Sequence, residues 1–272
     1  MPLLVWIVLF SALGGIASAA LAVSFLWIPE ARAARLLPHF VSFATGALLG
    51  AALLALLPEA IARAGVAGAH AIGLTLVLGL GVFFVIEKLV LWWHARGDDE
   101  AALEPQGHQH GGQHSHAGHS HRDRASGVLV LVGDSVHNAL DGVLIAAAFL
   151  TSVSLGLVTT LAVAAHEIPH RVGDFAILVQ AGFSRPRALL LNLATGLASV
   201  IGAVAAYYGL REALGLLPYA LAFASAGFLY IAVAGLIPGL HRRADARTSA
   251  LQVILISLGI AVIAIAEYLA GE

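Results

Sequence analysis

The sequence predicts an all-α protein that crosses a membrane many times. Hydrophobic residues make up 60% of its 272 residues and charged residues only 11%, against roughly 25% charged in a soluble domain. The apolar residues fall into long stretches, and an α-helix needs about 20 of them to cross a hydrocarbon layer of about 30 Å. Cys is absent, which excludes disulfides and thiolate metal sites. We therefore expect one transmembrane domain over residues 1–272.

Eight stretches are long and apolar enough to be spans. They run from Leu3 to Trp27, His39 to Leu57, His70 to Trp93, Gly127 to Leu150, Leu157 to Ala181, Ala188 to Tyr208, Pro218 to Pro238 and Ser249 to Leu269. All four Trp lie near the expected ends, where aromatic side chains favour the membrane surface. A short uncharged turn joins the fourth and fifth stretches, so we expect these two to form an antiparallel hairpin.

The connections between the spans differ in charge. The odd-numbered connections contain ten Arg, whereas the even-numbered ones contain Arg63 and Arg211. The ten are Arg32, Arg35, Arg96, Arg122, Arg124, Arg185, Arg187, Arg242, Arg243 and Arg247. Because loops rich in Lys and Arg stay in the cytoplasm, this predicts a multi-pass protein of a cell (inner or plasma) membrane with both termini outside.

A short internal repeat relates the second and seventh stretches. "FATGALLGAALLALLP" from Phe43 aligns with "FASAGFLYIAVAGLIP" from Phe223 at a constant offset of 180. The predicted orientation runs the two copies in opposite directions, as in the inverted repeats of transporters. We expect helices 1–3 and 6–8 to be related in this way around a central hairpin of helices 4 and 5. The alternative is chance similarity between two helices rich in Ala and Leu.

Ionisable residues gather in the fourth and fifth stretches, although each costs about 3 kcal/mol at the centre of a membrane helix. In the fourth, one helical face carries Asp134, His137, Asn138 and Asp141. In the fifth, a similar face carries His166, Glu167, His170, Arg171 and Asp174. Imidazole, carboxylate and amide groups on two facing helices predict a cation site. The alternative is a buried hydrogen-bond network that holds the hairpin together.

The run from His166 to His170 is the H-E-x-x-H pattern of zinc metalloproteases. An intramembrane protease of this kind would need Glu167 free as general base and an open position on the metal for water. Arg171 follows Glu167 by four residues, so the two can pair along the helix. "LDG" at Leu140 also precedes the H-E-x-x-H run, the reverse of the order in intramembrane site-2 proteases. These observations favour a site that metal ions pass through over a metalloprotease.

"HNALDG" from His137 followed by "HEIPHRVGDFAIL" from His166 resembles the paired signature of the ZIP (Zrt-, Irt-like) divalent metal transporters, in particular their histidine-rich subgroup. The likeness extends to "GVFFVIEKLVLWW" and "AGFLYIAVAGLIP". It implies a two-metal site on the fourth and fifth helices. One position would use His137, Asp141, His166 and His170, and its neighbour Asn138, Asp141, Glu167 and His170.

The sequence departs from that signature at Arg171, where the family has Glu. We hypothesise that this guanidinium takes the place of the second metal's charge and leaves one principal site. The alternative is that Arg171 points away from the site, where it would extend to the membrane surface or form a structural pair. Polar positions that the family has in its second and seventh helices are also apolar here, at Ala51, Ala55, Gly235 and Gly239.

Residues 97–126, which we call the histidine loop, join the third and fourth stretches. The loop carries six His, at His108, His110, His114, His116, His119 and His121. Its Gly, Gln and Ser content predicts disorder. We expect it to bind metal weakly as a cytosolic buffer or sensor; the alternative is a dispensable insert.

Together these features predict uptake of a divalent transition metal into the cytoplasm. His and carboxylate ligands suit Zn²⁺ first and accept Fe²⁺, Mn²⁺, Co²⁺ and Cd²⁺; no organic cofactor and no nucleic acid is expected. The expected partners are metal ions and the lipid bilayer, and a homodimer is left open. The alternatives are the intramembrane metalloprotease and a membrane metal sensor that does not transport.

Overall fold

The computed structural model describes residues 2–20, 30–102, 117–241 and 245–271, and these are helical with short turns and no strand. The longer helices are α1 (Leu3–Ala12), α3 (Glu30–Gly50), α4 (Leu57–Ala102), α5 (Ala117–Thr151), α6 (Val153–Gln180), α7 (Arg185–Arg211), α8 (Leu217–Tyr230) and α10 (Ala246–Gly271). Short elements complete the chain: π-helices η1 (Leu13–Ala17), η3 (Ala51–Leu56) and η5 (Ile231–Leu236), a 3₁₀ turn η4 (Leu214–Leu216) and α9 (Ile237–Leu240).

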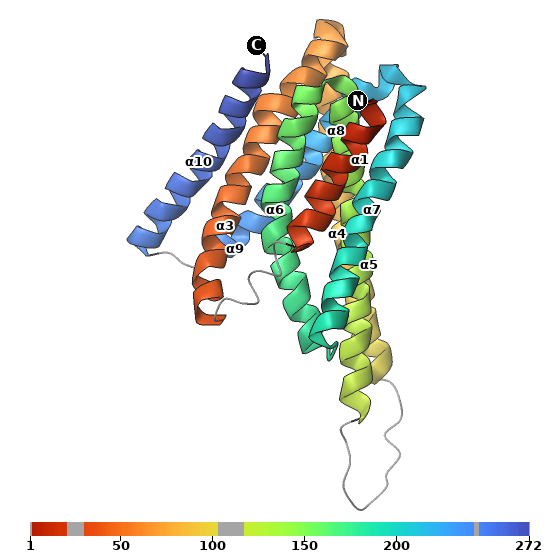
Figure 1. The fold of residues 1–272 in the computed structure, drawn as a ribbon, viewed down its shortest axis with the longest axis vertical. Coiled ribbons are helices and arrows are strands. Elements are labelled where there is room, and N and C mark those ends of the chain that lie inside the picture. The colour runs from red at the N-terminus through yellow and green to blue at the C-terminus, as the bar shows by residue number, and fades with distance from the viewer. Residues whose placement is uncertain (1, 21–29, 103–116, 242–244, 272) are drawn as a thin grey trace, which may run out of the picture.

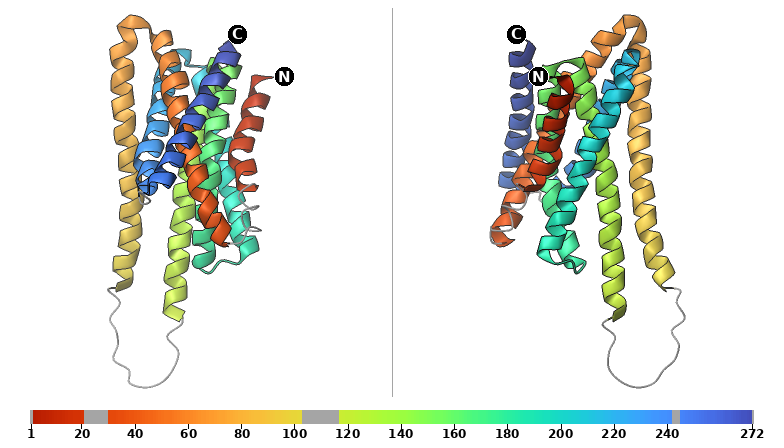
Figure 2. Two further views of the ribbon diagram at one scale, coloured as in Figure 1. Left: turned by 90° about the vertical axis from the view of Figure 1, so that its left-hand side faces the viewer. Right: turned by 45° about the vertical axis from the view of Figure 1, so that its right-hand side comes forward.

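Five segments of the described residues are long and apolar enough to cross a membrane, so the protein is a multi-pass membrane protein. They are Leu3–Ala20, Arg35–Leu89, Arg185–Arg211, Leu214–Leu240 and Ala246–Leu269. The second has 55 residues and is broken at Gly65, whose φ of 67° and ψ of 175° are not helical. The chain turns back on itself there (Figure 2). The helices α5 and α6 are not among the five because their ionisable residues lower their hydropathy.

Both termini lie at one end of the helix bundle (Figure 1). The start of α3, the end of α4 and the starts of α5, α7 and α10 lie at the other end. The odd-numbered connections, which carry ten Arg in the sequence, join helices at that end, and we call it the Arg-rich end. The termini therefore lie at the opposite end of the bundle from these connections.

The central helices approach closely at glycines. The most extensive packing is between α5 and α7, α4 and α8, and α3 and α10. At Gly142 on α5, an added Cβ would overlap the backbone carbonyl of Ser199 on α7, and at Gly202 on α7 it would overlap that of Ala139. Small residues of this kind let membrane helices pack backbone to backbone. This contact holds α7 against the polar face of α5.

The offset of 180 residues between the two aligned segments also relates features of the structure. The π-helix η3 covers residues 51–56 and η5 covers 231–236, so both copies unwind at the same position. A Cβ added at Gly79 on α4 would overlap Ala226 and contact Phe223 on α8, and one added at Gly259 on α10 would overlap the backbone at Gly46 and Phe43 on α3. Adding 180 to Gly79 leads to Gly259, and adding it to Phe43 leads to Phe223. The α4–α8 and α3–α10 contacts are therefore equivalent in position.

Several element bounds differ from the expected ones. The helix α3 begins at Glu30 and continues through Pro38, nine residues before the expected start at His39. The helix α4 reaches Ala102 and α5 begins at Ala117, so both ends of the histidine loop are helical, while residues 103–116 lie outside the described part of the chain. The long α4 and α5 extend beyond the rest of the bundle at the Arg-rich end (Figure 2).

Candidate metal site between α5 and α6

The polar faces of α5 and α6 meet inside the bundle. The two helices are consecutive and antiparallel, and the side chain of Ser152 caps α6 by accepting a hydrogen bond from Leu155 N at 3.1 Å. Because the turn between them is so short, residues at equal distances from it lie at similar depths. This places Asp141 near His166 and, one to two turns further along, Asp134 near His170 and Asp174.

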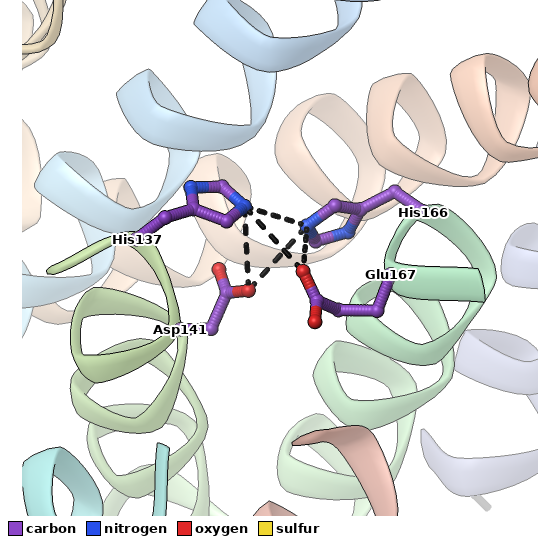
Figure 3. Close-up of side chains that lie close together, drawn as sticks. All are labelled: His137, Asp141, His166 and Glu167. Atoms are coloured by element: carbon purple, nitrogen blue, oxygen red, sulfur yellow. Dashed lines mark hydrogen bonds and ion pairs between the residues drawn. The ribbon is translucent and has the colours of Figure 1, made fainter. Parts of the chain in front are cut away.

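Four side chains form what we call the primary group: His137, Asp141, His166 and Glu167 (Figure 3). Each offers one nitrogen or oxygen, and these atoms all lie within 4.8 Å of one another. The Nε2 atoms of His137 and His166 are 3.3 Å apart. Asp141 Oδ2 lies 3.4 Å from His166 Nε2 and 3.7 Å from His137 Nε2, while Glu167 Oε1 lies 3.6 Å and 3.9 Å from His137 and His166.

These separations suit a tetrahedral ion better than a hydrogen-bond network. Ligands at about 2.0–2.1 Å from a zinc-like ion stand roughly 3.4 Å from each other at the corners of a tetrahedron. Most of the measured distances exceed hydrogen-bond length. Asp141 Oδ2 and Glu167 Oε1 are buried and have no hydrogen-bond partner. Two buried carboxylate oxygens without partners and two imidazoles are thus arranged so that they could hold a cation.

His166 is held in the orientation that metal binding needs. Its Nδ1 lies 3.1 Å from the carbonyl oxygen of Ala162, which assigns the ring proton to Nδ1 and leaves the Nε2 lone pair directed at the primary group. The ring is buried and packs edge-on against Phe228 of α8 at 6.2 Å between centroids. His137 is less enclosed, with 24% of its side chain exposed.

Three further side chains form the secondary group: Asp134, His170 and Asp174. His170 Nε2 lies 3.6 Å from both Asp134 Oδ1 and Asp174 Oδ2. The His170 ring is 5.4 Å from that of His137, so the two groups are neighbours. The family resemblance assigns His170 to both metal positions of one site, whereas here its Nε2 lies with the two Asp of the secondary group.

Arg171 is fully buried, with 0% of its side chain exposed, and lies behind both groups. Its Nε donates to Glu167 Oε2 at 2.8 Å, and its Nη1 donates to Asp134 Oδ2 at 2.7 Å. Its Nη2 donates to Asn138 Oδ1. One guanidinium thus joins a carboxylate of the primary group to one of the secondary group. Arg171 therefore points into the bundle and not to the membrane surface.

The helix α7 contributes two partners of Arg171 that the sequence reasoning missed. Arg171 Nη1 also donates to Thr195 and to Asn192 Oδ1 at 3.2 Å, and Asn192 Nδ2 donates to the Arg171 carbonyl at 3.0 Å. The available signal was the pair of polar residues three positions apart in an otherwise apolar stretch. The sequence does not tell where α7 packs against α5, so that signal did not point to Arg171.

Other predicted residues take different places. The side-chain nitrogen of Asn138 donates hydrogen bonds to Asp134, and its side-chain oxygen accepts one from Arg171. Asn138 therefore faces the guanidinium. Ala51 and Ala55 are buried in η3, and Gly235 lies in η5. In the histidine loop, His108, His110, His114 and His116 lie outside the described residues. His119 and His121 belong to the start of α5, where the structure describes the backbone alone.

A cavity of about 480 Å³ leads away from the primary group. His137 and His166 line one part of it, and Gly133, Asp134, His170 and Asp174 line the rest on α5 and α6. The lining residues of α5 precede Asp141, and α5 begins at the Arg-rich end (Figure 1). The cavity therefore extends from the primary group toward that end. Its opposite wall includes Glu87 on α4 and Tyr230 on α8, and the Tyr230 hydroxyl donates to Glu87.

Nearly the whole chain matches one known protein family. The family model described as ZIP zinc transporter matches residues 3–267. The chain belongs to the ZIP family. ZIP proteins are transporters and not enzymes, so the H-E-x-x-H run of α6 is part of a transporter helix and the metalloprotease hypothesis is rejected.

Individual ZIP relatives are similar over most of this chain. It is 35% identical over 257 residues to the zinc transporter ZIP13 of Homo sapiens, covering 83% of this chain and 69% of that protein. It is 35% identical over 241 residues to that of Pongo abelii, covering 83% and 65%. With the zinc transporter YKE4 of Saccharomyces cerevisiae it shares 29% identity over 253 residues, covering 87% and 72%. The chain thus spans slightly less than two thirds of the Pongo abelii protein's length.

Proposed function

We propose that this ZIP protein transports a divalent transition metal, most readily Zn²⁺, into the cytoplasm through the primary group. One observation carries the proposal. Four ligand atoms of His137, Asp141, His166 and Glu167 surround one point inside the bundle, and the two oxygens lack hydrogen-bond partners. Membership of a zinc-transporter family and relatives named as zinc transporters support the choice of metal. The same ligands accept Fe²⁺, Mn²⁺, Co²⁺ and Cd²⁺.

The proposed architecture has eight spans, with helices 1–3 and 6–8 related as inverted repeats around α5 and α6. Five apolar segments, the break at Gly65 within the longest of them, and the polar hairpin support the count. The coincident π-helices and the equivalent contacts at Gly79 and Gly259 support the repeat. A π-helix inside a longer helix often marks a functional position, and η3 and η5 lie at equivalent positions of the two proposed halves.

The charge of the connections and the position of the cavity support the proposed direction of transport. The Arg-rich end is proposed to face the cytoplasm and the termini the outside. The cavity then connects the primary group to the cytoplasmic end, so the structure corresponds to an inward-facing state. A divalent ion that enters down a potential of 100 mV, inside negative, gains about 4.6 kcal/mol, twice the single-charge value. We place the protein in the plasma membrane or a bacterial inner membrane; the proposal leaves a homodimer open.

Arg171 is proposed to occupy the place of a second ion's charge. Its guanidinium already neutralises Glu167 and Asp134 and engages Asn138. We therefore expect one tight metal equivalent in the bundle. Arg171→Glu should bind a second tight equivalent, because it replaces a fixed cation with a ligand. Titration with Zn²⁺ against a competing chelator measures both, and two tight equivalents in the parent would contradict this role.

Uptake into proteoliposomes tests the function. Vesicles that contain a trapped zinc-sensitive dye should report Zn²⁺ entry with the parent, faster under an inside-negative potassium diffusion potential. His166→Ala and Asp141→Asn each remove a primary-group ligand and should lower the initial rate by at least about tenfold. His70→Ala, a change of the same type on α4 away from the site, is the matched control. Tight binding without Zn²⁺ entry would favour the metal-sensor alternative over transport.

A further inference from the structure

The secondary group contains a second set of metal-ligand atoms that the primary group does not use. We propose that Asp134, His170 and Asp174 form a distinct, weaker site for the same divalent cation, which receives the ion from the primary group and releases it into the cavity. The inference rests on the proposed function, because it assigns a release step to the same transport path.

The ligand atoms of the secondary group are spaced as the ligands of one metal ion would be. Asp174 is buried, with 6% of its surface exposed, and its Oδ2 has no hydrogen-bond partner. That oxygen and Asp134 Oδ1 each lie 3.6 Å from His170 Nε2. Both separations exceed hydrogen-bond length, so the three side chains do not satisfy one another. They are, however, close to the roughly 3.4 Å expected between the ligands of one zinc-like ion.

The charge around the cavity also favours a cation. Its lining includes the carboxylates of Glu87, Asp134 and Asp174, whereas no Lys or Arg is among the described residues that line it. The remaining lining is largely apolar, which strengthens the attraction by excluding water. Arg171 contacts Asp134 through Oδ2, while Oδ1 accepts a hydrogen bond from Asn138 Nδ2 at 2.9 Å and lies 3.6 Å from His170 Nε2. The cavity is lined by Asp134, His170 and Asp174, whereas Arg171 is not among its lining residues.

Two features make the secondary group weaker than the primary group. It offers three protein ligands and not four, which leaves a coordination position for water, as in catalytic zinc sites. One of its two carboxylates already shares its charge with Arg171 at 2.7 Å. In addition, 46% of the His170 side chain is exposed, so that ligand can move away from the ion. A weaker, more open site next to a tight one is what release requires.

The two sites are close enough for direct transfer. The His137 and His170 rings lie 5.4 Å apart at an angle of 68°, and both line the cavity. An ion held by His137 in the primary group therefore needs to move only about one helical turn to reach His170. Asp174 lies one turn further along α6, in the direction of the Arg-rich end.

Equilibrium dialysis with radioactive Zn²⁺ tests the inference on the full chain in detergent, with the six His of the histidine loop replaced by Ser so that they do not bind. The expected parent behaviour is one tight and one weaker equivalent. Asp174→Asn and His170→Gln should each weaken the second equivalent by at least about tenfold and retain the tight one. Asp174→Glu, which keeps the carboxylate, should retain both. Glu212→Gln, at an exposed carboxylate, is the matched control and should change neither.

The reciprocal variant separates this inference from the proposed function. Asp141→Asn should remove the tight equivalent and keep the weaker one. If it removes both, or if the weaker equivalent persists in Asp174→Asn and His170→Gln that remain monodisperse, the inference is wrong. If the parent shows the weaker equivalent alone, the primary group fails as the transport site while the secondary site stands.

Discussion

Replacing Arg171 with Met removes the guanidinium while keeping a long, apolar side chain in its place. In the parent, Arg171 is fully buried and pairs with Glu167 at 2.8 Å and Asp134 at 2.7 Å. It also bonds to Asn138, Asn192 and Thr195. Arg171→Met leaves two buried carboxylate oxygens without their cation. Removing one partner of a buried ion pair costs about 3–5 kcal/mol of unfolding free energy, and we expect a loss in that range.

Arg63→Met is the matched control. Arg63 pairs with Glu59 at 2.6 Å on α4, but the two side chains are 38% and 36% exposed. Exposed pairs contribute about 0–1 kcal/mol, so this variant should lose far less. The measurement is unfolding of the purified protein at increasing SDS mole fraction, followed by circular dichroism with EDTA present.

Added metal should stabilise Arg171→Met more than Arg63→Met. Without Arg171, a divalent cation can take over the charge of Glu167 and Asp134. Zn²⁺ at about 100 times its dissociation constant would return about 2.7 kcal/mol, whereas Arg63→Met should gain no more from Zn²⁺ than the parent does. An Arg171→Met protein that is no less stable than Arg63→Met in EDTA would refute the reasoning that Arg171 neutralises the two carboxylates.

Three other predictions follow from particular contacts. Gly142→Ala, whose new methyl would overlap the Ser199 carbonyl, should lower the unfolding free energy by about 1–3 kcal/mol; Gly173→Ala, with no atom within 4 Å of its added Cβ, is the control and should not destabilise. Replacing the six His of the histidine loop with Ser should leave vesicle uptake largely intact while changing its response to high metal, and complete loss of uptake would contradict the buffer role. Asp245 precedes α10 and caps its first turn by accepting a hydrogen bond from the backbone amide of Thr248 at 2.9 Å. Hydrogen bonds from the side chain and backbone amide of Thr248 hold the pKa of Asp245 below its usual range. The cap therefore stabilises α10 above pH about 4 and loses its effect as the pH falls through the pKa of Asp245 in the folded protein. Asp245→Ala should therefore lower the melting temperature slightly at pH 7, by an amount that shrinks on acidification, and a difference that grows on acidification would contradict the cap.

Several residues of the site can be identified from the order of amino acids alone. A polar side chain inside a membrane helix is costly, so Asp134, Asp141 and Glu167 stand out against their apolar neighbours. The helical period then shows that they share faces with the His residues. The same reasoning indicated that Arg171 could pair with Glu167, four residues earlier, which the structure confirms at 2.8 Å.

Other features depended on how the helices pack. Asn192 and Thr195 reach Arg171 because α7 packs against α5 at Gly142 and Gly202, a contact between residues far apart in sequence. The continuation of α3 through Pro38 was also not predicted, because a Pro inside a helix usually ends or kinks it.

The sequence by itself determined that the chain is a multi-pass helical membrane protein, which of its connections are rich in Arg, and which two helices carry the candidate metal-ligand side chains. Those properties depend on hydropathy and helical period, which are local. The tertiary structure alone decided how these ligands divide into a group of four and a group of three, and that Arg171 lies between their carboxylates. That division depends on the rotation and crossing of α5, α6 and α7, where a shift of about one ångström decides whether two atoms can bind the same ion.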